Sequence, residues 1–213
     1  MERIIVSGFR KFGDYKTNAS QDVAYKMRGM KISGFEIMPA IFDASISREN
    51  RGQHLSEIAD TVSAKGIITL GMASEKTGLC VERTAKNRIF NEKYVTAPFN
   101  NTPVDNRRLY PEKLSLELGM WNIPKWQEKC RQDRIPCTEI SDDAGGFCCN
   151  QLMYQFCAYQ VDASPKIPFI FIHIPCNKEA IADLATFTRA GKVTMEIDQV
   201  IDGLILLLAN ASF

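Results

Sequence analysis

The chain has 213 residues, of which 45% are hydrophobic and 24% charged, as is ordinary for a single globular domain spanning residues 1–213. Lys and Arg number 26 against 25 Asp and Glu, so the formal net charge is +1 and nothing indicates a nucleic-acid or membrane-surface protein. No apolar run approaches the roughly 18 residues of a membrane span, and the apolar residues 4–6 are too few for a signal-peptide core.

Short apolar runs alternate with helical patterns along the chain. Strands are predicted at residues 4–7, 35–39, 66–70, 79–89, 137–140 and 168–174, the second of them near a sheet edge because of Pro39. Helices are predicted at residues 18–28 (with Asn18 as N-cap), 45–63, 124–134, 151–160 and 194–210. Residues 91–111 are polar and rich in Pro and Asn, and are expected to be irregular. This alternation predicts a largely parallel sheet covered by helices on both faces.

The seven cysteines are an odd number and include no CxxC pair. In the absence of a secretory signal, such a set favours free thiols in a reducing compartment. The two histidines, His54 and His173, lack the spacing of a zinc site, so no metal site is expected.

The chemistry is expected around residues 142–150, which read DDAGGFCCN. Ala-Gly-Gly predicts a tight turn, and the helical pattern that follows places a cysteine in the first helical turn. The positive end of the helix dipole would lower a thiol pKa from about 8.5 to about 7. Cys148 and Cys149 point about 100° apart on a helix, so only one of them can face a pocket.

Three further features admit both a functional and a structural interpretation. His173 closes an apolar strand and is either a core histidine or the partner of the helix-start cysteine. Glu82 is either an exposed or salt-bridged glutamate, or the group that orients an imidazole. Phe9 and Phe12 are either core aromatics under a loop or the walls of a small apolar pocket. Because parallel sheets bind ligands at the carboxyl ends of their strands, the Phe9–Phe12 loop, the Cys148–Cys149 turn and His173 are expected to meet there.

Four segments, in order along most of the chain, resemble the motifs of the type I pyroglutamyl peptidases (pyrrolidone-carboxylate peptidases). Residues 7–13 with Asn18 are similar to a GFxPFG…N signature, and residues 81–87 to an ERxAxN motif. Residues 144–150 are similar to AGxxxCN, and residues 171–175 to FIHxP. One such motif is weak evidence, whereas four in the right order strongly indicate common descent.

The resemblance implies a three-layer α/β/α sandwich with a largely parallel, mixed sheet, and a cofactor-free cytoplasmic cysteine exopeptidase, often oligomeric. Its substrate would be a peptide whose N-terminus is blocked by pyroglutamate. Cys149 rather than Cys148 would be the nucleophile, with His173 as the base and Glu82 as its orienting group. By the same resemblance, substrate would be bound by the following residues: Phe9, Phe12, Asn18, Met72, Phe147 and Cys148. Arg88 would stand in for the arginine that the family places after the ERxAxN motif.

The chain also departs from the family pattern at the pocket rim. Lys11 replaces a usual proline, Asp14 a usual glycine, and Cys176 a usual tyrosine. Asp142 and Asp143 add negative charge, which would raise the pKa of the nucleophile. Two alternatives therefore stay open: a related amidohydrolase in which Asp14 accepts a cationic substrate, and a non-catalytic member used for binding.

Overall fold

The computed structural model describes residues 1–45, 50–87 and 111–213. Its strands are β1 (Glu2–Phe9), β2 (Lys31–Ile32), β3 (Phe35–Phe42), β4 (Ala64–Met72), β5 (Cys80–Glu82), β6 (Thr84–Lys86), β7 (Lys113–Ser115) and β8 (Phe169–Ile174). Its helices are α1 (Ala19–Lys26), α2 (Arg51–Val62), α3 (Ile123–Gln132), α4 (Cys148–Tyr159), α5 (Leu184–Arg189) and α6 (Ile197–Asn210). Short 3₁₀ helices span Gly119–Trp121, Gln160–Asp162 and Lys178–Ala180.

The main sheet has six strands in the order β2-β3-β1-β4-β8-β5. The four central strands β3, β1, β4 and β8 are parallel, and the two edge strands β2 and β5 pair antiparallel to their neighbours. The predicted largely parallel, mixed sheet is therefore confirmed. The predicted edge character of residues 35–39 also holds, because β2 pairs only with Phe35 and Glu36 and leaves Pro39 free of a ladder on that side.

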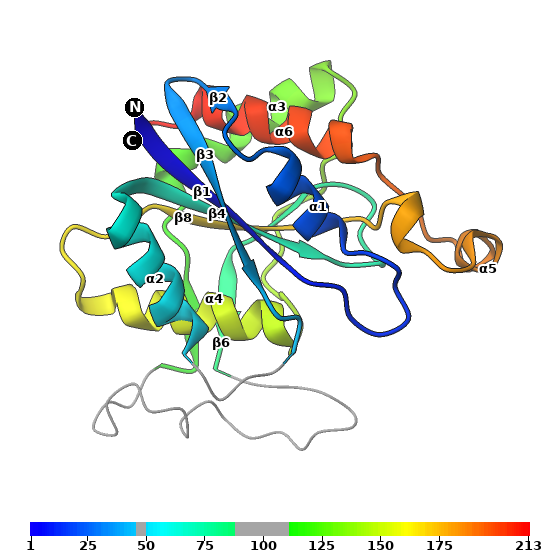
Figure 1. Ribbon diagram of the computed structural model, residues 1–213, viewed down its shortest axis with the longest axis horizontal. Helices are drawn as coiled ribbons and strands as arrows, with labels where there is room; N and C mark the ends of the chain where they lie inside the picture. Colours follow the sequence, from blue (N-terminus) through cyan, green and yellow to red (C-terminus); the bar gives the residue numbers. More distant parts are fainter. Residues whose placement is uncertain (46–49, 88–110) are drawn as a thin grey trace.

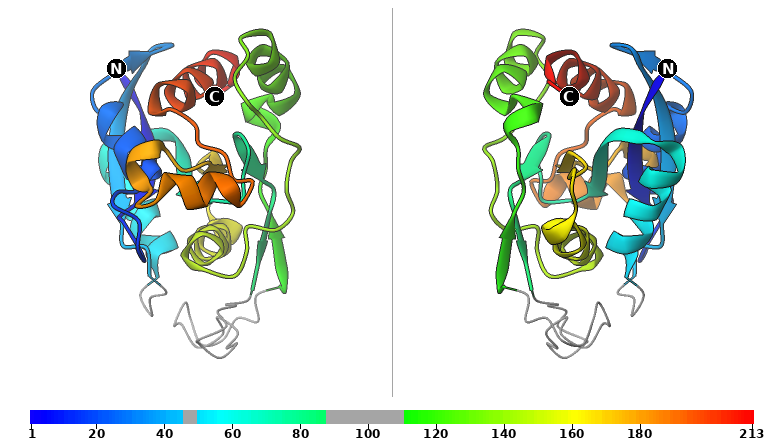
Figure 2. Two further views of the ribbon diagram at one scale, coloured as in Figure 1. Left: turned by 90° about the vertical axis from the view of Figure 1, so that its right-hand side faces the viewer. Right: turned by 90° about the vertical axis from the view of Figure 1, so that its left-hand side faces the viewer.

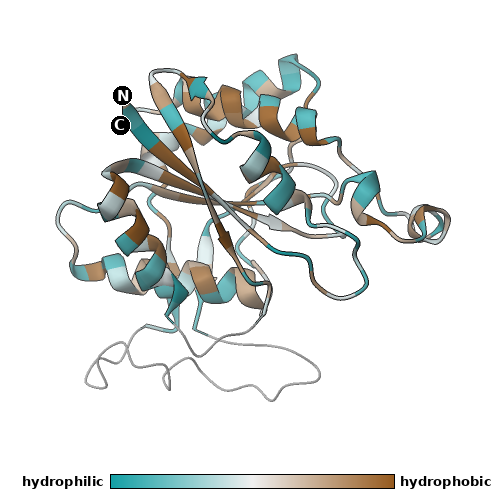
Figure 3. Cartoon of the chain, viewed as in Figure 1, coloured by the Kyte–Doolittle hydropathy of each residue, from teal (hydrophilic) through white to brown (hydrophobic). Residues whose placement is uncertain are grey.

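Helices cover both faces of this sheet, which confirms the three-layer arrangement (Figures 1 and 2). Helices α1, α3 and α6 lie over one face, and α2 and α4 lie packed together over the other. The central strands are mostly hydrophobic, whereas hydrophilic and hydrophobic residues alternate along the helices (Figure 3). Two buried clusters result, one on each face of the sheet.

Side-chain alternation along the central strands decides which residues face α4. In β8, Ile170, Ile172 and Ile174 pack in the cluster under α1, α3 and α6. Phe169 and Phe171 pack in the cluster under α4. Since the side-chain period of a strand is two, His173 points to the same face as Phe171. The strand therefore directs His173, its last residue but one, toward the helix that contains Cys149.

The predicted strand at residues 137–140 was wrong. This segment runs beside β5 but forms no continuous ladder with it, because the pairing consists of two isolated bridges, Leu79 with Cys137 and Glu82 with Ser141. Between the two bridges, the chain advances four residues from Cys137 to Ser141 but only three from Leu79 to Glu82. One extra residue therefore interrupts the ladder, as in a β-bulge. The element before Cys149 is thus a bulged edge segment and not a regular strand.

Other boundaries differ from prediction. The strand predicted at 79–89 breaks at Arg83 into β5 and β6, and β6 pairs with β7 in a separate two-stranded sheet. Helix α2 begins at Arg51, capped by the Asn50 side chain, and residues 46–49 lie outside the described part. Helix α6 begins only at Ile197, where Glu196 and Gln199 form a capping box. The predictions for residues 88–110, including Arg88, also lie outside the described residues.

Candidate active site

Helix α4 begins earlier than predicted, at Cys148, and this places Cys149 in its first turn. The turn before it is tight: Gly145 has a φ of 78°, and its N–H donates to Asp143 Oδ1 at 3.0 Å. Phe147 is the N-cap residue, and its side chain makes no capping hydrogen bond. The Phe147 side chain therefore does not occupy the N–H groups of the first turn. These groups can donate to the carbonyl oxygen of a reacting substrate.

A buried carboxylate holds the imidazole of His173. Its Nδ1 lies 2.8 Å from Glu82 Oε1, and both side chains are buried. Strand pairing explains the contact, since Cys80 is opposite His173 and Glu82 is two residues further along β5. Such diagonal neighbours on one face of a sheet lie within side-chain reach. With Nδ1 engaged by the carboxylate, Nε2 is the nitrogen left for proton transfer.

Gly71, at the end of β4, lies between the imidazole and the thiol. A Cβ placed on Gly71 would lie 2.9 Å from Cys149 Sγ and 3.0 Å from His173 Nε2. The two reactive atoms therefore face the same small space, which only a residue without a side chain leaves open. The three elements α4, β4 and β8 bring these atoms together at the carboxyl end of the sheet.

The pKa of the Cys149 thiol is raised, contrary to the expectation from the helix start. The neighbouring Cys148 and burial cause most of this rise, and the charges of Glu82 and Glu75 add to it. A rise was also expected from Asp142 and Asp143, but these carboxylates are paired elsewhere. Cys149 is consequently a neutral thiol that needs a base to become a nucleophile.

Glu82 is ionised in this site. Burial raises its pKa, but hydrogen bonds and charge from His173, together with Ser141 and Lys76, outweigh burial and lower the pKa to about 2. Lys76 Nζ lies 2.9 Å from Glu82 Oε1, the oxygen that also contacts His173. The carboxylate is therefore anionic at any pH at which the protein would work.

A pocket of about 300 Å³ opens onto the thiol and the imidazole. It is lined by Cys149 and His173 and by all six residues predicted to bind substrate: Phe9, Phe12, Asn18, Met72, Phe147 and Cys148. Both adjacent cysteines therefore line the pocket, and the expectation that only one of them could face it was wrong. Glu82 lies behind His173 and does not line it, and neither does the exposed Asp14. Asp14 at the rim had motivated the cationic-substrate alternative, which thus loses its structural basis.

The aromatic residues serve both as core and as pocket wall. Phe9 is 1% exposed and belongs to the buried cluster under α4, yet its ring also lines the pocket. Phe12 is half-buried, with its ring centroid 5.1 Å from Tyr15 and 6.4 Å from Phe147. Asn18 fixes their loop, because its Nδ2 donates to the Arg10 carbonyl at 3.0 Å while its Oδ1 caps α1.

Polar contacts join the turn before Cys149 to the strand that follows Glu82. Arg83 and Thr84 bind Asp142 and hold the pKa of that carboxyl well below its usual range. Lys86 Nζ pairs with Asp143 at 2.8 Å. The buried Asn150 accepts from the Lys86 N–H at 2.8 Å and donates to the Lys86 carbonyl at 2.9 Å. These contacts tie the start of α4 to the segment that directly follows Glu82.

Sequence reasoning missed several residues of the site, among them Tyr15 and Lys76, which line the pocket, and Gly71, which lies against Cys149 and His173. Gly71 had a usable signal, since a glycine at the end of a buried strand often marks a close approach of other groups. Tyr15 and Lys76 had none, because both lie in loops whose position depends on the packing of distant segments.

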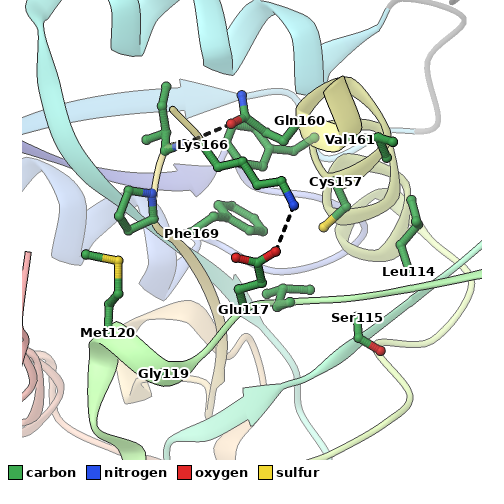
Figure 4. A pocket seen from close by; sticks show the side chains of 14 residues that line it. Leu114, Ser115, Glu117, Gly119, Met120, Cys157, Gln160, Val161, Lys166 and Phe169 are labelled. Atoms are coloured by element: carbon green, nitrogen blue, oxygen red, sulfur yellow. Dashed lines mark hydrogen bonds and ion pairs between the residues drawn. The ribbon is translucent and has the colours of Figure 1, made fainter. Parts of the chain in front are cut away.

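A second cavity of about 280 Å³ lies at the other end of the sheet (Figure 4). Its lining includes Phe169, at the amino end of β8, and Cys157 on α4, and Lys166 pairs with Glu117 at 2.7 Å across it. It contains none of the predicted site residues and lies at the amino end of the strand that ends in His173. The chemistry therefore belongs to the first pocket, at the carboxyl ends of the strands.

The described residues contain neither a cluster of metal ligands nor a membrane-spanning helix. Across residues 1–45, 50–87 and 111–213, no group of three His, Cys, Asp or Glu side chains is arranged to hold a metal ion. Over the same residues, no helix has the length and apolar content needed to cross a membrane.

Comparison with known proteins identifies the family of the chain. The model of the pyroglutamyl peptidase family matches residues 2–212. The chain is 26% identical to a pyrrolidone-carboxylate peptidase of Halalkalibacterium halodurans, with 92% of this chain and 98% of that one covered. A second such peptidase, from Vibrio campbellii, is also 26% identical, with 97% and 91% covered.

Solved structures support the fold. A pyrrolidone carboxyl peptidase variant from Pyrococcus furiosus superposes with a TM-score of 0.80 at 22% identity, covering 98% of this chain and 97% of that one. The Thermococcus litoralis enzyme gives 0.78 at 20% identity, with 99% and 93% covered. The chain belongs to the pyroglutamyl peptidase family of cysteine-type exopeptidases, which remove an N-terminal pyroglutamyl residue from peptides.

Proposed function

We propose that Cys149, His173 and Glu82 form the catalytic triad with which this chain removes the pyroglutamyl residue. The observation that supports it most is the space beside Gly71, which Cys149 Sγ and His173 Nε2 face from two elements. Glu82 binds the opposite nitrogen of the same imidazole at 2.8 Å. This sequence of contacts from thiol to imidazole to carboxylate supports the proposal, because acyl transfer uses a nucleophile, a base and a group that orients the base.

The reaction would proceed in two halves. His173 Nε2 takes the Cys149 proton while sulfur forms a bond to the pyroglutamyl carbonyl carbon. The C–N bond to the next residue then breaks, and the imidazolium returns its proton to the departing amine. Water, deprotonated by His173, next attacks the thioester and releases pyroglutamate, and the proton returns to Cys149. Such base and acid catalysis contributes about 10²–10⁴ in rate.

The charge that develops on the carbonyl oxygen needs hydrogen-bond donors. Backbone N–H groups in the first turn of α4 would supply them, helped by the positive end of the helix dipole. Helix α4 begins at Cys148, so the nucleophile and these donors belong to one rigid element. Arg88, which lies outside the described residues, is proposed as an additional stabiliser of charge.

The residues of the pocket wall would explain why the site prefers the lactam ring of a pyroglutamyl group. Phe9, Phe12 and Phe147 would enclose the ring, and Asn18 and the backbone near Met72 would shape the remaining wall beside Cys148. A pyroglutamyl group carries no ammonium, so it can leave water without losing the hydration of a charge. Burying a neutral polar group without a partner costs roughly 1–3 kcal/mol, and burying a charge costs more.

We propose peptides with a blocked N-terminus as substrates, the cytoplasm as the compartment, and a homo-oligomer as the working form. All seven cysteines are free, which fits a reducing compartment. The oligomer follows from the family resemblance, and light scattering of the purified chain would test it.

Release of a fluorophore from three amides tests the function. The pyroglutamyl amide should be cleaved, whereas the prolyl amide, which bears a charged ring nitrogen, and the glutaminyl amide should not. Efficient cleavage of the prolyl amide would contradict the assigned specificity. Absence of any cleavage by the reduced chain would contradict the activity.

A further inference from the structure

Lys76, in the loop between β4 and β5, is part of the Glu82–His173 contact. Its Nζ lies 2.9 Å from Glu82 Oε1 and donates to Cys80 Sγ at 3.3 Å. The lysine side chain is 18% exposed, and it lines the same pocket as Cys149 and His173. One carboxylate oxygen therefore lies between an ammonium and an imidazole.

The charges around Glu82 make this lysine consequential. Glu82 is completely buried, and its second oxygen, Oε2, has no hydrogen-bond partner among the described residues. Within that part of the chain, Lys76 and His173 are the only basic side chains within ion-pair distance of it. An ionised carboxylate in such a site needs a counter-charge, because leaving it unpaired is costly. Without Lys76, protonated His173 would be the remaining counter-charge.

A protonated His173 cannot take a proton from Cys149. The Cys149 pKa is raised, so catalysis needs a neutral imidazole with Nε2 free. The ammonium of Lys76 already balances the carboxylate, so protonation of His173 would add an excess positive charge to a buried cluster. Lys76 thus opposes protonation of the base while leaving the Nδ1 contact intact.

We propose that Lys76 is a positioning residue that acts through Glu82 to keep His173 neutral and its Nε2 available to Cys149. The inference rests on the proposed function of these three residues.

Other titratable groups near the imidazole differ from Lys76 in their effect on the protonation of His173. Cys80 lies opposite His173 on β5, Cys149 Sγ lies beside Gly71 as His173 does, and Cys148 and Tyr15 line the same pocket. The pocket carboxylates Glu75 and Asp143 both favour a protonated imidazole, so they oppose Lys76.

Direct titration of the histidines by NMR tests this without using activity. The chain has only two histidines, and the exposed His54 on α2 provides an internal reference. In Lys76→Met, the titration midpoint of His173 should rise by about 1–3 pH units, the shift expected for one charge at this range. Lys76→Arg should keep the parental midpoint. The matched control Lys178→Met, which removes an exposed ion pair with Glu196, should also leave it unchanged.

An unchanged or lowered His173 midpoint in Lys76→Met would overturn the proposal. Lys76→Gln provides a second neutral side chain, and failure of both neutral variants to fold would assign the lysine a purely structural role and also overturn it. The pH profile of kcat/KM on a pyroglutamyl amide gives a second readout, in which the acid limb should move by the same amount. A raised KM with an unchanged acid limb of the pH profile would instead indicate that Lys76 contacts the substrate, and it would contradict the proposal. If the parent lacked activity, the proposed function would fail while the titration still reported on Lys76.

Discussion

Replacing Gly71 with alanine inserts one methyl group between the nucleophile and its base. The new Cβ would lie 2.8 Å from His173 Cδ2, 2.9 Å from Cys149 Sγ and 3.0 Å from His173 Nε2. Carbon atoms in favourable contact are about 3.5–4.0 Å apart, so each of these neighbours must move by several tenths of an ångström or more. The thiol and the imidazole would be pushed apart along the path of proton transfer.

The expected consequence is a loss of rate larger than the loss of stability. A misplacement of about 1 Å can cost about 10²-fold in rate, so kcat/KM on a pyroglutamyl amide should fall at least about 10²-fold. Overpacking of this size costs about 1–3 kcal/mol in the free energy of unfolding. Fluorophore release measures the first quantity, and urea denaturation measures the second.

Gly66→Ala is the matched control on the same strand. Its Cβ would meet the Phe213 ring at 2.7 Å, at the opposite end of β4 from the site. This variant should lose stability to a similar degree but retain kcat/KM once folded. Full activity in Gly71→Ala would refute the assignment of this space to proton transfer, as would an equal loss of activity in both variants.

Two other substitutions test the support of the triad. Glu82→Gln should lower kcat/KM by about 10²–10⁴-fold, because the imidazole loses its anionic partner. Since the folded pKa of Glu82 is lowered to about 2, its stabilising effect is full above about pH 4.5 and is lost as pH falls toward 2. The melting temperature of Glu82→Gln should therefore depend less on pH over this range, and an unchanged slope would argue against the pairing. Asn150→Asp keeps the acceptor for the Lys86 N–H but removes the donor to its carbonyl. It should destabilise the fold by about 1–3 kcal/mol. A melting temperature equal to that of the parent would show that the hydrogen bonds between Asn150 and Lys86 do not stabilise the fold.

The central elements could be predicted because their patterns are local. The apolar run before His173 predicted β8, and the Ala-Gly-Gly turn followed by a helical pattern placed a cysteine in the first turn of α4. Whether Glu82 reaches His173 could not be decided, because that contact depends on the antiparallel register in which Cys80 pairs with His173. The register is a property of two strands far apart in the sequence.

The failures also have physical causes. Residues 137–140 looked like a strand, but one extra residue relative to β5 breaks the ladder, and a pattern of apolar residues carries no information on its partner. The helix start was expected to lower the thiol pKa. Burial and the adjacent Cys148 raise it instead, because these neighbours outweigh a dipole worth roughly 0.3–2 kcal/mol.

The most direct test of the account compares serine variants of the two adjacent cysteines. Cys149→Ser and Cys148→Ser make the same chemical change one residue apart in the first turn of α4. Fluorophore release from a pyroglutamyl amide should be abolished in Cys149→Ser and should persist in Cys148→Ser. Turnover that survives in Cys149→Ser but disappears in Cys148→Ser would contradict the account, because Cys148 would then be the nucleophile.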